Sequence, residues 1–242
     1  MGKYVLITGG TKGIGKAIAY HLGKAGYNLI LTYASDDQVA ENECRLLTEQ
    51  YAVIAYPVKA DITHKESIDH IHKFLLLKGL KLDALVFNAG ITCRDSFESL
   101  SVEKWEEVFF ANVHFPVFLL QQILPCINPG GSVVFTGSLM GIHPHSVSLP
   151  YGVTKSAVHS LVKNLVKFLK PYKVRVNGIA PGFVDTEWQK TKPAEIRKNI
   201  ENKLSLERFC EPEEVAEVYK MLIENSYLNG EIVVIDGGYS YK

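Results

Sequence analysis

The sequence predicts an α/β fold in which a parallel sheet carries helices on both faces. Three observations support this prediction. Strand-like apolar runs are continuous rather than alternating, as in strands that are buried on both sides. Amphipathic helical patterns separate these runs, as in repeated β-α-β units. No linker, repeat or low-complexity tract divides the 242 residues, so we expect a single domain over residues 1–242.

The first half of the chain alternates strand and helix. Continuous apolar runs predict four strands: Tyr4 to Thr8, Leu29 to Thr32, Val53 to Val58 and Leu82 to Phe87. Apolar residues that recur at helical spacing predict the helices between them: from Ile14 up to Gly26, from Asp36 to Gln50, and from Ile68 to Leu75. A glycine-rich turn separates the first strand from the first helix.

The second half repeats this pattern. A helix is predicted from about Val102 to Leu124, where Pro125 ends it. A strand at Ser132 to Thr136 and a helix at about Tyr151 to Leu169 follow. The last two strands are predicted at Val174 to Ile179 and within Gly230 to Gly238.

One segment of the second half departs from the alternation. Between Gly182 and Phe209 the sequence becomes polar and loses its strand character. Long irregular segments inside compact domains are usually lids or binding loops. We therefore expect a flexible substrate lid over about residues 183–209.

Composition argues against several classes of function. The 26 basic and 26 acidic side chains cancel, so we expect no nucleic-acid partner. No apolar run approaches the roughly 20 residues that span a bilayer, so we expect no membrane segment. The segment Met1 to Tyr4 leads directly into a strand, so we expect no signal peptide. The four cysteines are scattered, which favours a cytoplasmic protein with reduced thiols and no metal site.

The glycine-rich turn is a candidate phosphate-binding site. Gly9, Gly13 and Gly15 lie in it, and glycine lets a backbone approach a ligand closely. The N–H groups at the start of the next helix would then face a pyrophosphate. The spacing Gly-x-x-x-Gly-x-Gly differs from the commoner Gly-x-Gly-x-x-Gly of dinucleotide-binding folds. A glycine-rich turn that binds no ligand is the alternative interpretation.

Ser138, Tyr151 and Lys155 form the candidate catalytic group. Ser138 follows a buried apolar run, and Tyr151 and Lys155 are four residues apart, so they share one face if they lie on one helix. A phenol with a pKa of about 10 exchanges protons poorly at neutral pH, whereas a neighbouring ammonium stabilises the phenolate. Alone, this spacing favours a structural role, but beside the glycine-rich turn it favours catalysis.

Five motifs of the chain carry a family resemblance. They are Thr8 to Gly15, Asn88-Ala89-Gly90, Ser138, Tyr151-x-x-x-Lys155 and Pro181-Gly182. In order and spacing they resemble the classical short-chain dehydrogenase/reductase family, and the similarity extends from Lys3 to about Tyr239. The resemblance implies a Rossmann-like, doubly wound sheet of seven mostly parallel strands and a nicotinamide cofactor. It also implies an oxidoreductase acting on CH–OH or C=O groups, a small carbonyl substrate and a homotetramer.

The resemblance also implies a role for each catalytic residue. Tyr151 would donate a proton to the carbonyl oxygen, and Lys155 would lower the phenol pKa and hold the nicotinamide ribose. Ser138 would polarise the carbonyl. Asn112 falls where the family carries its catalytic asparagine and would support a water molecule beside Lys155.

The same resemblance implies a set of cofactor contacts. Asp61 and Ile62 would contact the edge of the adenine, and Val184 and Thr186 the nicotinamide carboxamide. The complete set is Gly9, Thr11, Lys12, Gly13, Ile14, Gly15, Tyr33, Asp61, Ile62, Asn88, Ala89, Gly90, Tyr151, Lys155, Pro181, Gly182, Val184 and Thr186.

The end of the second predicted strand bears on the choice of cofactor. Enzymes that prefer NAD commonly place an acid there, but this chain has Thr32-Tyr33-Ala34-Ser35, with Asp36 and Asp37 later. Lys12 matches a basic position that contacts the 2′-phosphate of NADP in family members. We therefore predict NADP(H) rather than NAD(H). The alternative for Lys12 is a solvated lysine at the start of a helix.

Several stretches resemble the bacterial 3-oxoacyl-[acyl-carrier-protein] reductases: Asn88 to Thr92, Ala180 to Thr186, and Arg208 to Ala216. Those enzymes usually carry basic residues just before the strand that leads to the catalytic serine, where an acidic acyl carrier protein docks. The stretch Leu124 to Gly131 has no lysine or arginine. Lysines at 167, 170 and 173 are an alternative source of charge, or simply solvated. Docking of an acyl carrier protein therefore stays open, whereas ketone reduction is expected.

Two functions remain open at this point. The first is an NADPH-dependent carbonyl (ketone) reductase, including the case of a 3-oxoacyl-thioester reductase. The second is a non-catalytic NADP(H)-binding sensor or scaffold with the same fold. The intact catalytic residues argue against the second, because non-catalytic relatives tend to lose the tyrosine or the lysine. The loop from Leu139 to Pro150 is expected to select the substrate.

Overall fold

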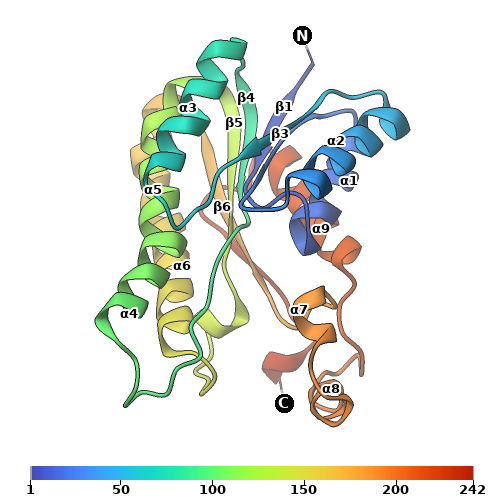
Figure 1. The fold of residues 1–242 in the computed structure, drawn as a ribbon, viewed down its shortest axis with the longest axis vertical. Coiled ribbons are helices and arrows are strands. Elements are labelled where there is room, and N and C mark those ends of the chain that lie inside the picture. Colours follow the sequence, from blue (N-terminus) through green and yellow to red (C-terminus); the bar gives the residue numbers. More distant parts are fainter. Residues whose placement is uncertain (1, 242) are drawn as a thin grey trace.

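Seven parallel strands form one sheet in the order β3-β2-β1-β4-β5-β6-β7 (Figure 1). A computed structural model describes residues 2–241. Met1 and Lys242, the two ends of the predicted domain, lie outside the described residues, and so does the start of the segment from which no signal peptide was expected. The strands are β1 Tyr4–Ile7, β2 Asn28–Tyr33, β3 Ala55–Lys59, β4 Leu82–Phe87, β5 Ile127–Thr136, β6 Arg175–Pro181 and β7 Ile232–Ile235. The predicted α/β class and the doubly wound, seven-stranded sheet are confirmed.

Helices cover both faces of the sheet, as continuous apolar strands require. They are α1 Gly13–Lys24, α2 Asp37–Tyr51, α3 Glu66–Lys78, α4 Val102–Phe109, α5 Phe115–Ile123, α6 Leu149–Leu169, α7 Glu187–Lys190, α8 Ala194–Glu201 and α9 Pro212–Glu224. In Figure 1, α3, α5 and α6 form one layer and α1, α2 and α9 form the other. Phe115 and Phe135 are buried in the core under the first layer, and Ile18 and Tyr219 in the core under the second.

The strand order reverses direction between β1 and β4, which are neighbours in the middle of the sheet. The chain leaves β1 toward one helical layer and β4 toward the other, so a crevice opens beyond their carboxyl ends. Ligands of open α/β sheets bind at such a switch point. The topology therefore places the glycine-rich turn and the Asn88–Gly90 segment at the mouth of one crevice.

The predicted helix from Val102 to Leu124 is interrupted. A π-helical turn, Phe110–His114, separates α4 from α5. A π-turn inserts one extra residue into the helix and often marks a functional site. Apolar spacing alone predicted an uninterrupted helix, because apolar residues recur on both sides of the π-helical turn.

The expected irregular segment at residues 183–209 is partly helical. It contains α7 and α8, and Val184 forms an isolated parallel bridge with Cys210. These two helices are short and their sequences are largely polar, so the sequence pattern did not identify them as helices. Whether the segment moves as a lid stays a prediction.

The stretch Val102–Cys126 is long and apolar enough to span a bilayer by length and composition, which differs from the sequence expectation. Its residues Phe115, Leu119 and Ile123 are buried in the core beside the sheet. Asn112 within it makes hydrogen bonds to the segment after β4 and to α6. The stretch is therefore packed as part of the doubly wound core.

Candidate active site

A cleft of about 590 Å³ opens at the carboxyl ends of the central strands. The predicted residues that line it are Gly9, Lys12, Gly13, Ile14, Tyr33, Asp61, Ile62, Asn88, Ala89, Gly90, Tyr151, Lys155 and Thr186. Further lining residues that the sequence reasoning did not single out as site residues are Thr32, Ala34, Ala60, Thr63, Ile91, Thr136, Glu187 and Trp188. Most of them are sequence neighbours of predicted site residues at strand ends, and this proximity could have identified them.

Seven predicted residues are not among those that line this cleft: Thr11, Gly15, Asn112, Ser138, Pro181, Gly182 and Val184. Thr11 is buried within the glycine-rich turn. The backbone N–H of Gly182 donates to Ile235 O at 2.8 Å, which ties the end of β6 to β7.

The glycine-rich turn has the geometry of a phosphate cradle. Gly13 begins α1 with a φ of +51°, a conformation that favours glycine. A Cβ on Gly15 would collide with Gly9 O and lie 2.6 Å from Asn88 Nδ2. No side chain caps the start of α1, because Lys12 occupies the N-cap position without a capping bond. The first N–H groups of α1 are therefore available to a ligand.

Hydrogen bonds lock this turn to the end of β4. Thr8 Oγ1 accepts from the backbone N–H groups of Asn88 and Ala89, at 2.9 and 3.1 Å. Asn88 Nδ2 donates to Thr8 O at 3.1 Å. Two segments eighty residues apart in sequence thus form one rigid floor under the cleft.

Asp61 closes the cleft beyond β3. Its Oδ1 accepts from the backbone N–H and the hydroxyl of Thr63, at 2.9 and 2.7 Å. Burial raises the pKa of Asp61, but the two hydrogen bonds from Thr63 outweigh it, and the pKa lies below its usual value. The carboxylate is therefore ionised at neutral pH and is an acceptor at the position predicted for the adenine edge.

Lys12 stands at the entrance of the cleft near the end of β2. Its ammonium lies 3.4 Å from Asp36 Oδ2, in an exposed pair. Asp36 also caps α2 by accepting from Val39 N at 3.1 Å. The neighbouring Asp37 pairs with Lys59 at 2.9 Å. Long, exposed pairs contribute little to stability, so Lys12 is free to turn toward a ligand at small cost.

Tyr151 and Lys155 lie in the first two turns of α6 and face the cleft together, as predicted. The Lys155 ammonium lies 5.4 Å from the centroid of the Tyr151 ring and donates to Thr136 O at 2.7 Å. Burial lowers the pKa of Lys155 to about 8. At neutral pH the side chain is therefore still largely a cation, held in a buried site.

The pKa of Tyr151 differs from the sequence expectation. Burial raises it above 10.0, while a hydrogen bond with the Ser138 side chain lowers it. The Lys155 ammonium lies over the ring, and no hydrogen bond joins it to the phenol oxygen within residues 2–241. In this geometry Lys155 therefore does not produce the lowering that was expected.

Ser138 is held by its backbone and its side chain. Its Oγ accepts from Met140 N at 3.1 Å, and its hydroxyl is the group that hydrogen-bonds with Tyr151. Its backbone N–H donates to His159 Nε2 at 3.3 Å. Burial, with Lys155 and Lys163 nearby, lowers the pKa of His159 to about 4, so the ring is neutral and accepts this bond. His159 was missed; its position four residues after Lys155 was the available signal.

Asn112 lies in the π-helical turn and bridges two elements. Its Nδ2 donates to Ile91 O at 2.9 Å and to Thr154 Oγ1 at 3.0 Å, and its Oδ1 accepts from Ile91 N at 2.9 Å. A Cβ on Gly90 would lie 3.1 Å from Asn112 Oδ1 and 3.4 Å from Lys155 Nζ. Glycine at position 90 therefore lets the predicted asparagine and lysine approach the same point.

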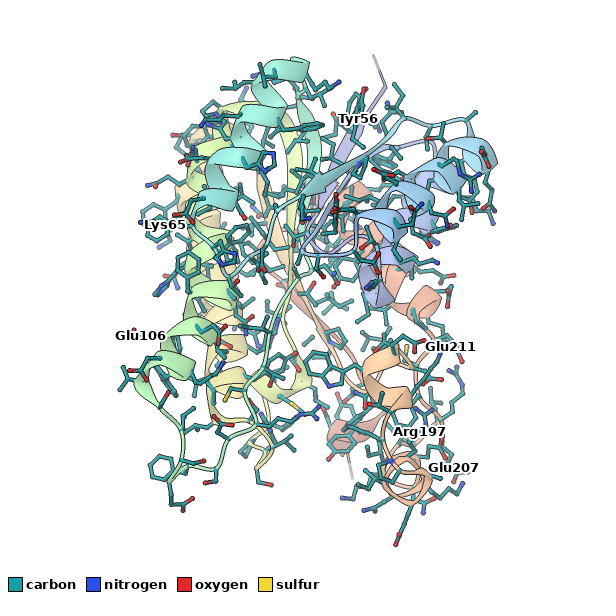
Figure 2. The ribbon with its side chains drawn as sticks, in the orientation of Figure 1. Tyr56, Lys65, Glu106, Arg197, Glu207 and Glu211 are labelled. Atoms are coloured by element: carbon teal, nitrogen blue, oxygen red, sulfur yellow. The ribbon has the colours of Figure 1, made fainter. Side chains whose placement is uncertain are left out.

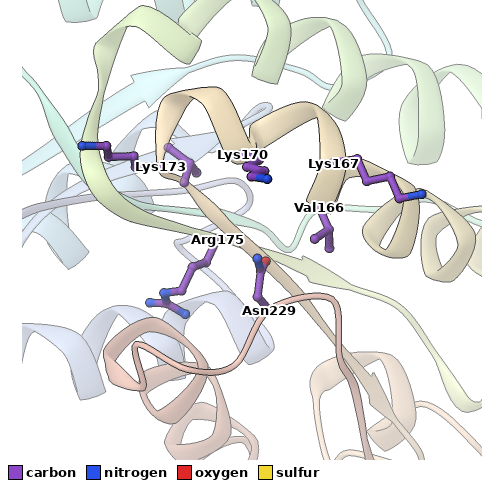
Figure 3. A pocket seen from close by; sticks show the side chains of 7 residues that line it. Val166, Lys167, Lys170, Lys173, Arg175 and Asn229 are labelled. Atoms are coloured by element: carbon purple, nitrogen blue, oxygen red, sulfur yellow. The ribbon is translucent and has the colours of Figure 1, made fainter.

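The lysines considered for carrier docking lie elsewhere. Lys167, Lys170 and Lys173 line a second cleft, of about 310 Å³, at the end of α6 and the start of β6 (Figure 3). The Arg175 guanidinium in this cleft is occupied by the backbone carbonyls of Leu222, Ile223 and Leu228. Lys170 is about 22 Å along α6 from Lys155 at the rise of an α-helix. This basic cluster is therefore separate from the catalytic group.

The residues around the main cleft fit a dinucleotide. Its volume lies within the range of small-molecule sites. Uncapped N–H groups of α1 suit a pyrophosphate, Asp61 is an acceptor, and Lys12 supplies a cation at the rim. Within residues 2–241, no group of three His, Cys, Asp or Glu side chains is placed to hold a metal ion. All four cysteines are free thiols.

A family profile and a curated relative each match nearly the whole chain. A family profile described as "Enoyl-(Acyl carrier protein) reductase" matches residues 9–240. The 3-oxoacyl-[acyl-carrier-protein] reductase of Aquifex aeolicus is 34% identical over 243 aligned positions, covering 98% of this chain and 97% of that protein.

Solved structures are similar over nearly the whole chain. A short-chain dehydrogenase/reductase from Serratia marcescens superposes with a TM-score of 0.92 at 28% identity, covering 99% of this chain and 98% of that one. L-sorbose reductase from Gluconobacter frateurii, complexed with NADPH and L-sorbose, superposes with a TM-score of 0.92 at 26% identity. That match covers 100% of this chain and 97% of the reductase.

Proposed function

Because the chain belongs to the short-chain dehydrogenase/reductase family, we propose that it is an NADPH-dependent ketone reductase with Tyr151 as general acid. Membership makes it an oxidoreductase of CH–OH and C=O groups with a nicotinamide cofactor. The observation that carries the proposal is the convergence of Tyr151 and Lys155 on a cleft that begins at the uncapped end of α1.

Each catalytic side chain has a task in this proposal. When bound, the reduced nicotinamide supplies a hydride to the carbonyl carbon. Tyr151 transfers its hydroxyl proton to the carbonyl oxygen. Ser138 donates a hydrogen bond from its hydroxyl to the same oxygen and orients it. In the described structure the Lys155 ammonium makes no hydrogen bond to the phenol oxygen. In this proposal it approaches that oxygen as the proton leaves and stabilises the phenolate, because an opposite charge nearby favours the ionised form.

The remaining residues hold the cofactor and return the proton. The turn from Gly9 to Gly15 holds the pyrophosphate, Asp61 and Ile62 the adenine, and Asn88 to Gly90 the adenine ribose. Val184 and Thr186 hold the carboxamide of the nicotinamide. Asn112 supports a water molecule from which a proton passes by way of Lys155 to Tyr151. The rigid floor of Thr8 and Asn88 supports these assignments.

NADPH is proposed over NADH on the basis of charge. Lys12 lines the cleft near the end of β2, and its pair with Asp36 is long and exposed. The chain has no acid at the end of β2 itself, where NAD-preferring enzymes hold the ribose 2′-OH. The solved reductase in complex with NADPH supports the same choice.

A substrate panel tests the proposed function. Loss of NADPH absorbance is followed with acetoacetyl-CoA, because the relative from Aquifex aeolicus is a 3-oxoacyl reductase, and with a series of small ketones. We expect turnover with at least one of them. Tight NADPH binding without turnover of any ketone would instead favour the NADP(H)-binding sensor or scaffold.

A further inference from the structure

Two cations in segments next to the cleft form no ion pair with a carboxylate in the described structure. Arg94 follows the Asn88–Ile91 segment, and its guanidinium carbon lies 5.6 Å from the ring centroid of Trp188, which lines the cleft. Lys192 lies between α7 and α8, with its ammonium 5.8 Å from the ring centroid of Phe183. Within residues 2–241, neither forms an ion pair with an acidic side chain.

Their neighbours are paired, which makes these two cations unusual. Arg197 on α8, labelled in Figure 2, binds Asp185 at 2.9 Å. Lys190, two positions before Lys192, binds Glu187 at 3.2 Å. Asp185 and Glu187 are thus already paired with other cations. Lys192 is half-buried, so solvent compensates its charge only in part.

The two cations also repel each other. Burial lowers the pKa of Lys192, and the charges of Arg94 and Arg197 lower it further. Arg94 and Lys192 come from segments about a hundred residues apart in sequence, so the fold itself brings these like charges to one place. An anion between them would remove the repulsion and form charge-assisted hydrogen bonds to both.

We propose that Arg94 and Lys192 bind an anionic group of the substrate, so that this reductase acts on ketones that carry a carboxylate or a phosphate. The inference rests on the proposed function. Trp188 and Phe183 present their ring faces to Arg94 and Lys192, respectively, and of these two rings Trp188 lines the cleft. The anion is either the carboxylate of a small oxo acid or a phosphate of an acyl-thioester carrier.

Matched pairs of acid and ester test this inference. The probes are acetoacetate, 4-oxopentanoate and 5-oxohexanoate, each beside its neutral ethyl ester, and acetoacetyl-CoA represents the thioester source. We expect kcat/KM for one free acid to exceed that for its ester by about tenfold or more, since hydrogen bonds to charged groups are worth more than neutral ones. Added salt should reduce this ratio.

Variants identify the residues responsible. Arg94→Gln and Lys192→Met remove charge while keeping most of the side-chain length, and each should lower the acid-to-ester ratio at least fivefold. Arg94→Lys, which keeps the charge, should retain more of the ratio than Arg94→Gln. Lys198→Met is the matched control because that lysine is already paired with Glu201 and neither residue lines the cleft, so it should leave the ratio unchanged.

The outcomes separate this inference from the proposed function. If acetoacetyl-CoA is the best substrate and responds to the same variants, the anion is the phosphate of a carrier, and the site stands. If esters are reduced as well as acids, or the variants change both equally, the anion site is overturned while the ketone reductase stands. If NADPH binds and no probe is reduced, both are overturned.

Discussion

Lys155 is a buried cation whose only hydrogen-bond acceptor in the described structure is Thr136 O. Burying a charge without a paired carboxylate costs stability. A structural role would not require such a group, because an apolar side chain of the same length would fill the space. Strongly perturbed groups in a cleft are candidates for function. The burial of this one residue thus favours a catalytic role for Lys155 over a purely structural one.

The free-energy cost of burying the Lys155 charge leads to a prediction for the variant Lys155→Met. We expect the variant to lose ketone reduction while its free energy of unfolding at pH 7 is equal to or above that of the wild type. The folded pKa of about 8 lies below the ordinary 10.5, so the unfolded chain binds more protons between these values. Wild-type stability should therefore rise with pH in this window, by up to about 1 kcal/mol per pH unit, relative to the variant.

Chemical denaturation of both proteins from pH 7 to 10.5 measures this difference. The variant should lie above or level with the wild type at pH 7, and the gap should narrow as the pH rises. A variant much less stable than the wild type at pH 7 would show that Lys155 stabilises the fold.

Lys12→Ala tests the choice of cofactor. We expect the Kd for NADPH to rise about tenfold or more, because a hydrogen bond to a charged phosphate is lost, while the Kd for NADH stays nearly constant. Fluorescence titration with both cofactors measures the change. Lys24→Ala, at the far end of α1, is the control. Equal affinity of the wild type for NADPH and NADH would contradict the assignment.

Motif residues could be predicted from the sequence because their side chains act at fixed spacing along the chain. Tyr151 and Lys155 share α6, and the glycines share one turn. His159 had only its spacing after Lys155 as a signal, and Arg94 and Lys192 had none, because the roles of all three depend on contacts with other segments. Local spacing carries no record of such contacts.

At the scale of elements, α6 is the helix that carries the chemistry. It begins at Leu149, two residues before the predicted start, because Ser148 Oγ caps it by accepting from Tyr151 N at 3.3 Å. Thr92 Oγ1 also donates to Ser148 Oγ, at 3.0 Å. The cap therefore links the start of the catalytic helix to the segment after β4.

Ser148→Ala should destabilise the protein by about 1 kcal/mol, the usual value of an N-cap. It should also lower kcat, because Tyr151 lies in the first turn that the cap holds. Denaturation and steady-state kinetics measure the two effects. Ser160→Ala, at an exposed position of the same helix, should change neither. Full activity and stability in Ser148→Ala would show that the cap does not position Tyr151.

Strand and helix boundaries differ from the predictions where polar or glycine residues continue an element. β5 begins at Ile127 rather than Ser132, through Gly130 and Gly131. α9 was not recognised, although Glu211 and Glu214 form a capping box around Pro212 at its start. The π-helical turn at Asn112 could not be recognised because the spacing of its apolar residues does not differ from that of an ordinary α-helix.

At the scale of the whole molecule, the family resemblance predicts a homotetramer. Large apolar side chains are exposed on the helical layer of α5 and α6: Phe118 is 50% exposed and Phe168 is 72% exposed. A contact between copies would cover such side chains. We expect sedimentation to give about four times the chain mass of 27.0 kDa. A monomer at micromolar concentration would contradict this expectation.

The doubly wound sheet brings the predicted cofactor-binding and catalytic segments to one crevice. The order of strands places the turn after β1, the floor after β4 and the start of α6 around the same cleft. The central claim is that Tyr151 supplies the proton there.

The most direct test compares Tyr151→Phe with the wild type on the best ketone of the panel, together with the Kd for NADPH. We predict that kcat falls by about 10²- to 10⁴-fold, as for loss of a general acid, while the Kd for NADPH changes less than about twofold. Tyr172→Phe, at a half-exposed position, should match the wild type. Turnover by Tyr151→Phe within tenfold of the wild type would contradict the account.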